Sequence, residues 1–467
     1  MTVSANDTNL RTVGWPTQDV GGHRPRRIRT VLRGASRDEV ARIVVEAATA
    51  RQPLSVISTG RNWGLGSAMP IRDGSAVLDL SAMDEIRSLD TERGIAVVEP
   101  GVTQRMLAAA VSGTPWMLNV TSSCADTSVV GNALDRGDGT IRARSEDVLG
   151  LEAVLADGSV ITTGGLTVNG VYRGRTAGPD LTQALVQSNL AVVTAAVVSL
   201  IARPESIRLC HALVPRGAVL AVLDVLASLV ATMPCLGMPR LREFQLAGPA
   251  TDPRSDTLSV LIPVLGPGAV VDFVAGYVVE RLSSLDTVAV IRCVDTESTP
   301  PDDPLYPRTL VARGIPTCEL VRHALRGDSC DVDEHAPAGL LIVLPLIPLD
   351  RAGARRAVTV LRTLTRGYPG TVTVEVNVAA THTARAVVQI AFDRTSAQQT
   401  RRAHALREQL WQAFAGQMYR ADIDHADGAL RAHDATNARM LDALKAAVDP
   451  DDIVLPGRFL ASRRTRS

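Results

Sequence analysis

The sequence predicts an α+β protein built from two structural units, and three observations lead to this prediction. In the first 205 residues, short apolar runs typical of strands alternate quickly with helical runs. Turn-forming residues such as Ala156-Asp157-Gly158 separate these runs. After Ala202-Arg203-Pro204 the rhythm changes to longer strands and helices, which predicts a second unit built on an antiparallel sheet. A chain of 467 residues is long enough for both units.

The elements of the first unit follow from the spacing of apolar residues. A helix is expected over residues 35–50, where apolar residues recur with helical spacing. The next apolar run, residues 54–57, is typical of a strand and leads directly into a glycine-rich loop. Further strands are expected at residues 76–80, 95–99, 152–155 and 160–163. This unit is expected to end near residue 205.

The second unit is expected over residues 206–412, with strands and helices of similar length. Its first half predicts strands at residues 207–214, 258–264 and 288–293, and helices at residues 218–232 and 269–282. A proline-rich loop at residues 299–304 follows. Its second half predicts strands at residues 340–347, 371–378 and 386–392, and helices at residues 352–364 and 397–414.

Composition excludes several classes of protein. The chain carries 49 basic and 49 acidic side chains, and this balance argues against a nucleic-acid partner. No apolar run reaches the length of about 18 residues that a membrane span needs, and the first 30 residues do not resemble a signal peptide. The six cysteines form no CxxC pair, so neither a metal site nor a disulfide framework is expected. A cytoplasmic location fits these features.

Two loops of the first unit have the composition of a cofactor site. The loop at residues 58–66 contains three glycines that do not fit the GxGxxG pattern, so a Rossmann dinucleotide site is rejected. Glycines nevertheless let a backbone approach a phosphate and aim N–H groups at it, although an ordinary turn after a strand is the alternative. The loop at residues 122–137 is rich in small and hydroxyl residues. Together the loops suit a ligand with a diphosphate and a large planar ring.

Five ordered motifs carry a resemblance to a known family. Residues 58–70, 98–102, 130–137, 187–190 and 448–458 resemble the vanillyl-alcohol oxidase and 4-cresol dehydrogenase family of FAD-linked enzymes. The resemblance implies FAD as the cofactor. It also implies a two-part, PCMH-type FAD-binding domain, formed by residues 1–205 and a returning C-terminal segment, residues 413–467. Residues 206–412 would then be the substrate domain, also called the cap.

The resemblance also implies positions for the cofactor. Residues 58–67 would cradle the diphosphate, residues 127–132 would run along the isoalloxazine ring, and residues 188–194 would reach the adenine side. The FAD-binding residues expected on this basis are Ser58, Thr59, Gly60, Arg61, Asn62, Trp63, Gly64, Ser67, Pro100, Ser123, Cys124, Thr127, Ser128, Gly131, Asn132, Asn189, Val193 and Arg458.

A candidate substrate contact is the pair Tyr419-Arg420, which stands where the family has a Tyr-Arg pair that holds a substrate phenolate. A phenol hydroxyl and a guanidinium both stabilise a phenolate oxygen. The alternative is a tyrosine packed beneath a surface arginine. Leu65 replaces a further phenolate-binding tyrosine of the family, and aromatic residues are few, so a simple para-alkylphenol is not expected as the substrate.

Two further catalytic candidates also come from the resemblance. Ser123 stands where the family can have an acid near the flavin, and Asp126 is a nearby substitute. His382 lies roughly where the family has a histidine in the cap, although a structural histidine is an equal alternative.

The resemblance raises the question of a covalent bond to FAD. The cap position that often carries a bonding histidine falls near Leu340, and His335 lies five residues earlier. The loop histidine used by the related berberine-bridge family is absent from Arg61-Asn62-Trp63. Cys124 stands seven residues before Gly131, which is the spacing of the bonding cysteine in that family, but a buried packing cysteine is the favoured alternative. We therefore expect non-covalent FAD.

The predicted function is an FAD-dependent oxidoreductase that transfers a hydride from a small phenolic or alcohol-like molecule, such as a natural product, to the flavin. A dehydrogenase is preferred to an oxidase because Thr127 stands where oxidases of the family tend to have a smaller residue. The alternatives are a non-oxidative flavoprotein, such as a cyclase or isomerase, and a non-catalytic flavin-binding subunit. The expected partners are a small-molecule substrate and, at most, a second copy of the chain in a homodimer.

Overall fold

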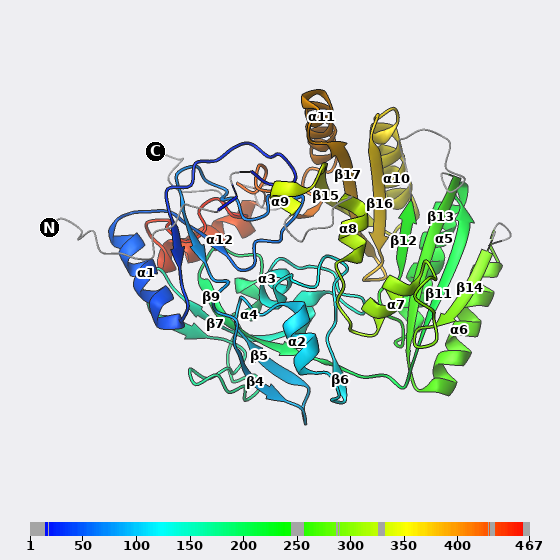
Figure 1. Cartoon of the computed structure of the whole chain (residues 1–467), viewed down its shortest axis with the longest axis horizontal. Coiled ribbons are helices and arrows are strands. Elements are labelled where there is room, and N and C mark those ends of the chain that lie inside the picture. Colours follow the sequence, from blue (N-terminus) through cyan, green and yellow to red (C-terminus); the bar gives the residue numbers. More distant parts are fainter. Residues whose placement is uncertain are drawn as a thin grey trace.

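The computed structural model shows two lobes that lie side by side (Figure 1). It describes residues 15–460 apart from residues 17, 244–255, 286–287, 289, 326–331, 428 and 430–434. The first lobe contains the chain up to β10 (Ile201–Ala202) and the C-terminal helix α12 (Ala435–Val448). The second lobe contains one large sheet and the helices that cover it. The predicted α+β class is confirmed.

The first lobe contains two main sheets. The smaller sheet is parallel, with the strand order β1 (Val31–Arg33), β3 (Ala76–Asp79), β2 (Leu54–Ile57). The larger sheet is antiparallel, with the order β4 (Ile86–Asp90), β5 (Ile95–Val98), β9 (Val192–Ser199), β7 (Val148–Val154), β8 (Val160–Thr162). A short antiparallel pair joins β6 (Trp116–Met117) to β10 (Ile201–Ala202). The helices are α1 (Arg37–Thr49), α2 (Gln104–Ala110), α3 (Val129–Leu134) and α4 (Thr182–Leu185).

The C-terminal segment belongs to the core of the first lobe. Helix α1 begins after Ser36, whose hydroxyl accepts a hydrogen bond from the backbone of Glu39, and its buried face packs over β2 and β3. Val454 lies in the same apolar cluster. The backbone of Leu54 in β2 donates to Ile453 at 2.8 Å and accepts from Leu455 at 2.8 Å. The chain end is therefore held beside the strand that leads into the glycine-rich loop.

The second lobe is built on an eight-stranded antiparallel sheet. Its order is β14 (Val290–Asp295), β11 (Ser206–Pro215), β13 (Thr257–Gly266), β12 (Arg240–Glu243), β16 (Thr371–Asn377), β17 (Thr383–Asp393), β15 (Ala338–Pro348), β18 (Met418–Arg420). Helices α5 (Val219–Thr232), α6 (Gly268–Ser283), α10 (Arg351–Thr365) and α11 (Ala397–Ala413) share one large apolar cluster with this sheet. The predicted antiparallel sheet is thus present, and β12 and β18 are additions to it.

The two faces of this sheet differ because side chains alternate along a strand. Leu241 and Val374 point into the apolar cluster under the helices. Their neighbours Arg240, Glu375 and Asn377 point the other way, and two of them hydrogen-bond to loop 138–139 of the first lobe. The polar face of the sheet therefore faces the first lobe.

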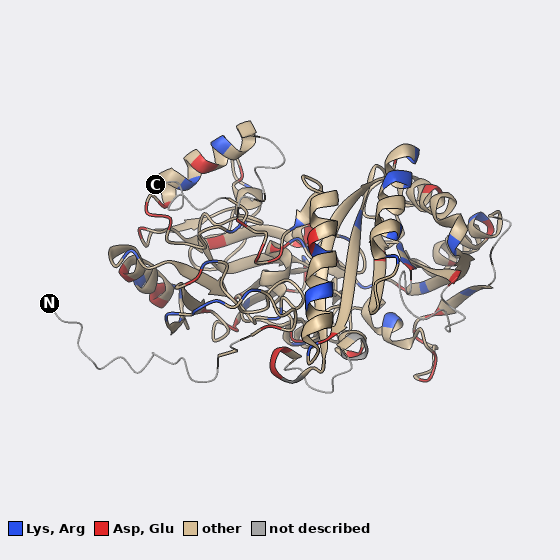
Figure 2. Cartoon of the chain, turned by 90° about the horizontal axis from the view of Figure 1, so that it is seen from above, with Lys and Arg blue, Asp and Glu red and all other residues tan. Residues whose placement is uncertain are grey.

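Three short helices lie between the lobes in Figure 1: α7 (Tyr306–Ala312), α8 (Glu319–Leu325) and α9 (Val332–His335). Basic and acidic residues are interspersed over both lobes in the view of Figure 2. Among the described residues, no helix is both long enough and apolar enough to cross a membrane.

Candidate active site

A cavity with about 1000 Å³ of empty space lies in the first lobe beside the polar face of the large sheet. Four segments line it: the loop after β2, the first turns of α3, the chain from residue 185 to 193, and the C-terminal residues Leu455 and Arg458. Arg420 from β18 closes one side.

The loop after β2 reaches the cavity through glycine geometry. Gly60 has a φ of +68°, in the left-handed region that favours glycine. Gly131 in α3 has a different role, because a Cβ atom there would lie 2.5 Å from the hydroxyl oxygen of Ser58. The missing side chain of Gly131 thus allows α3 and the loop to approach each other along the cavity wall.

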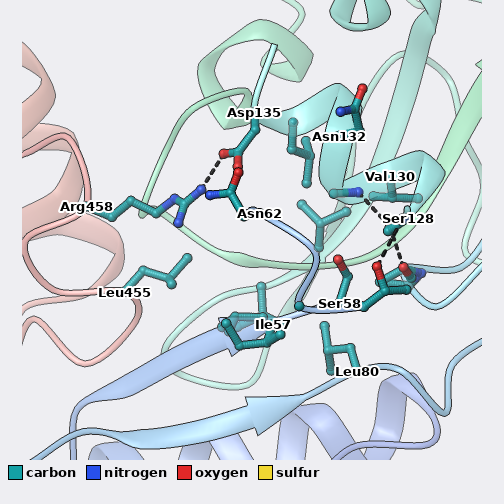
Figure 3. A pocket seen from close by; sticks show the side chains of 18 of the residues that line it. Ile57, Ser58, Asn62, Leu80, Ser128, Val130, Asn132, Asp135, Leu455 and Arg458 are labelled. Carbon is teal, nitrogen blue, oxygen red and sulfur yellow. Dashed lines mark hydrogen bonds and ion pairs between the residues drawn. The ribbon is translucent and has the colours of Figure 1, made fainter. Parts of the chain in front are cut away.

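Ser128 connects the segments that form this wall. Its hydroxyl caps α3 by accepting from the backbone of Gly131 at 2.8 Å, and it donates to the carbonyl of Pro100 at 2.6 Å. Its backbone N–H donates to the hydroxyl of Thr59 at 3.1 Å. Figure 3 shows Ser128 and Ser58 close together on this wall. Ser128 therefore joins three separate sequence motifs by hydrogen bonds.

Charged groups gather at the other end of the cavity. Asp135 forms ion pairs with Arg458 and, at 3.1 Å, with Arg420 (Figure 3 shows the first pair). Arg420 also donates to the side chain of Asn62 at 2.8 Å. Burial alone would raise the pKa of Asp135, but the two guanidinium groups hold it below its usual value.

These residues fit a dinucleotide. A diphosphate is bound by hydroxyl and backbone N–H donors and by guanidinium groups, and glycine lets the backbone come close to it. The cavity has such donors along one wall and guanidinium groups at one end. The cavity is lined by thirteen of the eighteen predicted FAD-binding residues: Ser58, Thr59, Gly60, Arg61, Asn62, Ser67, Pro100, Thr127, Ser128, Gly131, Asn132, Val193 and Arg458.

Gly64 and Trp63 lie outside this lining. Gly64 has a φ of +79°, as a glycine-rich loop requires. A Cβ atom there would lie 2.6 Å from the side chain of Ile342 in β15, and the carbonyl of Gly64 accepts from the backbone of Ile342 at 3.0 Å. A side chain at position 64 would therefore collide with the cap strand β15. Trp63 is buried in an apolar cluster with Leu340.

The other three predicted cofactor residues are also set back from the cavity. Ser123 lies behind Thr127, with 3.0 Å between their hydroxyl oxygens. Asn189 is buried, and its carbonyl accepts from Lys445 at 2.5 Å. Cys124 is fully buried, and its sulfur lies 2.6 Å from the sulfur of Cys318.

The predicted substrate pair, Tyr419 and Arg420, lies in β18, and its two members contact different groups. Arg420 points into the cofactor cavity, where Asp135 and Asn62 bind it. The ring of Tyr419 lies 5.5 Å from the guanidinium carbon of Arg385 in β17. Burial and then the charge of Asp138 raise the pKa of the Tyr419 hydroxyl, so it stays protonated at neutral pH.

The structure does not bring the other two catalytic candidates into this site. Asp126 is paired with the half-exposed Arg105 at 2.9 Å, which directs its carboxylate away from the cavity lining. His382 is exposed in the turn between β16 and β17, with its Nδ1 atom 3.4 Å from the hydroxyl of Thr381. Both residues lie in loops, whose length and conformation vary among related proteins.

Sequence reasoning missed a polar cluster on the cap sheet. It contains Arg240 and Arg242 of β12, Glu375 and Asn377 of β16, Arg385 of β17 and Arg308 of α7. Asp138 of the first lobe accepts from Asn377 at 2.8 Å and pairs with Arg385. The sequence around β12 carries no clear strand signal, because Leu241 is the one apolar residue among Arg240, Arg242 and Glu243.

Comparisons with known proteins identify an FAD binding domain in this chain and several similar flavoproteins. Residues 28–164 match the family model of an FAD binding domain. The chain is 27% identical to the 1'-carboxy-chondrochloren decarboxylase of Chondromyces crocatus, over 93% of this chain and 90% of that protein. It is 26% identical to the 4-cresol dehydrogenase [hydroxylating] flavoprotein subunit of Pseudomonas putida, over 87% of this chain and 82% of that protein.

Solved structures show the same fold. Substrate-bound p-cresol methylhydroxylase superposes with a TM-score of 0.81 at 23% identity, covering 93% of this chain and 89% of that one. The 4-ethylphenol oxidase of Gulosibacter chungangensis gives a TM-score of 0.82 at 21% identity, covering 94% and 90%. In fold and sequence the chain is therefore similar to members of the vanillyl-alcohol oxidase and 4-cresol dehydrogenase family, and residues 28–164 form an FAD binding domain.

Proposed function

We propose that this FAD-dependent oxidoreductase is a dehydrogenase for a small molecule with a phenolic or alcohol-like group. Bound FAD would supply the redox chemistry by accepting a hydride from the substrate carbon. The observation that carries the proposal is the position of β18 between the cofactor cavity and the polar side of the cap sheet. Arg420 lines the cofactor cavity, and the preceding residue, Tyr419, faces the polar side of the cap sheet. A substrate bound there would lie between the cofactor and the cap.

The protein's own groups would orient the substrate. The Tyr419 hydroxyl, kept protonated by burial, would donate a hydrogen bond to a substrate oxygen. Arg385, close to the same ring, would favour negative charge on that oxygen. The linked hydroxyl groups of Thr121, Ser123 and Thr127, at 2.7 and 3.0 Å, form a polar boundary behind the cavity.

Anaerobic mixing tests the proposed function. The FAD-loaded protein would be mixed without oxygen with a panel of phenols, benzylic alcohols and their natural-product derivatives, and the flavin absorbance would be recorded. Loss of the oxidised flavin band together with one equivalent of oxidised product supports the proposal. Product formation without loss of the band, or no reaction with any member while FAD is bound, counts against it.

Tyr419→Phe should lower kcat/KM for the true substrate while FAD content stays unchanged. The variant removes one hydrogen bond, which is worth about 0.5–1.5 kcal/mol, or about two- to tenfold in rate. Tyr277→Phe, at the edge of the apolar cluster on the far face of the sheet, is the matched control. Equal kinetics for Tyr419→Phe and the native enzyme would remove Tyr419 from the substrate site.

Reoxidation of the reduced flavin by air should be slow, as befits a dehydrogenase. Thr127 lines the cavity, and its branched side chain is held by Ser123. We expect Thr127→Gly to accelerate reoxidation in stopped-flow measurements. Thr127→Ser keeps the hydroxyl and removes only the methyl group, so it separates steric blocking from loss of the hydrogen bond. Native reoxidation as fast as that of an oxidase would contradict this prediction.

FAD should be bound non-covalently. Leu340 packs against Gly64 and has no group that can bond to a flavin. Burial and the neighbouring thiol of Cys318 raise the pKa of Cys124, so its sulfur is not the thiolate that such a bond requires. Acid precipitation should release the yellow colour into the supernatant. Colour that stays in the pellet, and is lost in Cys124→Ala, would establish a cysteinyl bond instead.

Decarboxylation is a second candidate function, supported by the arginines of the polar cluster and by the Chondromyces relative, whose name denotes a decarboxylase. In this reaction the bond to the carboxylate carbon breaks, CO2 leaves, and the remaining electron pair on the substrate carbon takes up a proton. The flavin then undergoes no net redox change. Release of CO2 without loss of the flavin band in the anaerobic experiment would favour this function.

A further inference from the structure

Three arginines lie close together on the polar face of the cap sheet: Arg240 and Arg242 of β12 and Arg308 of α7. We call this group the arginine face. Arg240 and Arg308 are largely buried, with side chains 7% and 16% exposed. Both approach the same carboxylate, Glu375, at 3.5 Å, which is long for a hydrogen bond. One carboxylate is thus shared between two buried guanidinium groups.

The three arginines also affect the protonation of Glu375. Burial alone would raise the pKa of Glu375, yet Arg308, Arg240 and Arg242 together hold it below its usual value. Burial lowers the pKa of Arg308 to about 10, while Glu375 raises it, so the guanidinium stays charged at neutral pH. Asp138 does not compensate the surplus of positive charge, because it is paired with Arg385.

The best hydrogen bonds of the arginine face go to neutral oxygens. Ser122 accepts from Arg240 at 2.8 Å and from Arg308 at 3.3 Å. Arg240 also donates to the carbonyl of Gly139 at 2.9 Å. Guanidinium groups bind anionic oxygens more strongly than neutral ones, and buried cations without full compensation are costly. This part of the site therefore favours an anionic ligand.

The arginine face adjoins the cofactor cavity. Ser122 directly precedes Ser123, whose hydroxyl oxygen lies 3.0 Å from that of Thr127 in the cavity wall. Beside Arg240 in the sheet register lies Asn377, which is 2% exposed. Its side-chain oxygen has no hydrogen-bond partner among the described residues. An unpaired buried acceptor at this position fits a ligand that also carries a donor, such as a hydroxyl group.

We infer that the substrate is a hydroxylated carboxylate, whose carboxylate is held by Arg240 and Arg308 with Arg242 beside them. The inference rests on the proposed function for the location of the substrate and names the substrate's chemical class. The carboxylate anchors one end of the molecule on the cap sheet. The reacting carbon then lies toward the cofactor cavity, within reach of the hydroxyl of Tyr419.

Benzoate and its neutral analogue benzamide test this inference by binding alone. Each would be titrated into the FAD-loaded protein, and binding would be followed by the flavin absorbance and by calorimetry. We expect benzoate to bind at least about tenfold more tightly than benzamide, as a charge-assisted contact predicts. Arg308→Met and Arg240→Met should each weaken benzoate binding about tenfold and leave benzamide binding unchanged.

The controls separate a local effect from misfolding. Arg355→Met, an exposed position on α10, should leave benzoate affinity unchanged. FAD content shows whether each variant is folded. If Arg308→Met or Arg240→Met fails to fold, Arg242→Met takes its place in the benzoate titration. Equal affinities for benzoate and benzamide, or an unchanged benzoate affinity in Arg308→Met and Arg240→Met, would overturn the inference.

The outcomes also distinguish this inference from the proposed function. If neutral phenols or alcohols reduce the flavin while benzoate does not bind, the inference fails and the proposed function stands. If benzoate binds through the arginines while no member of the panel, including hydroxylated arenecarboxylates, reduces the flavin, the proposed function fails and the carboxylate site stands.

Discussion

Gly131→Val is expected to weaken FAD binding and to lower the amount of FAD that copurifies. A Cβ atom at this position would lie 2.5 Å from the hydroxyl oxygen of Ser58 and 3.2 Å from that of Ser128. Valine adds two further methyl groups in the same crowded place, so α3 must move away from the loop after β2. The hydrogen bond from Ser128 to Thr59 joins these segments and would be lost with this movement. Overpacking of this kind costs about 1–3 kcal/mol, which corresponds to about five- to 150-fold in affinity.

The measurement is the ratio of flavin to protein absorbance after purification, followed by titration of the apoprotein with FAD. Gly276→Val is the matched control, because a Cβ atom at this exposed position of α6 meets nothing within 4 Å. The control should bind FAD as the native protein does. Stoichiometric FAD in purified Gly131→Val would show that the approach of α3 to Ser58 does not shape the cofactor site.

The sequence was most informative where local chemistry determines the structure. The glycine-rich loop after residues 54–57 and the hydroxyl-rich loop before α3 were both predicted, because loop residues that approach a phosphate need small side chains and hydroxyl donors. Both loops line the cavity. The long helices and strands of the cap were also predicted near their observed bounds, because their apolar periodicity is strong.

Features that depend on distant segments could not be predicted in the same way. Gly64 has the expected backbone conformation, but its neighbour is Ile342, a residue 278 positions later in the chain that only the packing of the two lobes brings close. The ion pairs of Asp135 with Arg420 and Arg458 likewise join positions 285 and 323 residues apart. No local pattern determines which arginine reaches which carboxylate.

Strand β12 could not be predicted from the local sequence for a different reason. Its four residues, Arg240–Glu243, include three charged side chains, and charged residues are uncommon in strands. The strand forms because β13 and β16 pair with it on both sides and because its one apolar residue, Leu241, enters the core. The short strand that propensity disfavours is thus the one that supplies Arg240 and Arg242 to the polar cluster.

A buried ion pair holds the C-terminal segment against the cofactor domain. Lys445 in α12 is 1% exposed and donates to three oxygens: the carbonyl of Asn189 at 2.5 Å, the carboxylate of Asp449 at 2.6 Å and the carbonyl of Val454 at 2.8 Å. Asp449 is fully buried, and it also accepts from the backbone of Ile453 and Val454. This network fixes the residues immediately before Leu455 and Arg458, which line the cavity.

Lys445→Met should therefore destabilise the protein strongly and weaken FAD binding at the same time. The variant preserves the aliphatic stem of the side chain but leaves the buried carboxylate of Asp449 without its cation, which typically costs about 3–5 kcal/mol. Urea unfolding and FAD titration measure the two effects.

Arg439→Met, exposed on the same helix, should change stability by less than about 0.5 kcal/mol. Adding Asp449→Asn to Lys445→Met should recover part of the loss, because the uncompensated charge is then removed. If Lys445→Met is as stable as Arg439→Met, the ion pair does not hold the C-terminal segment in place.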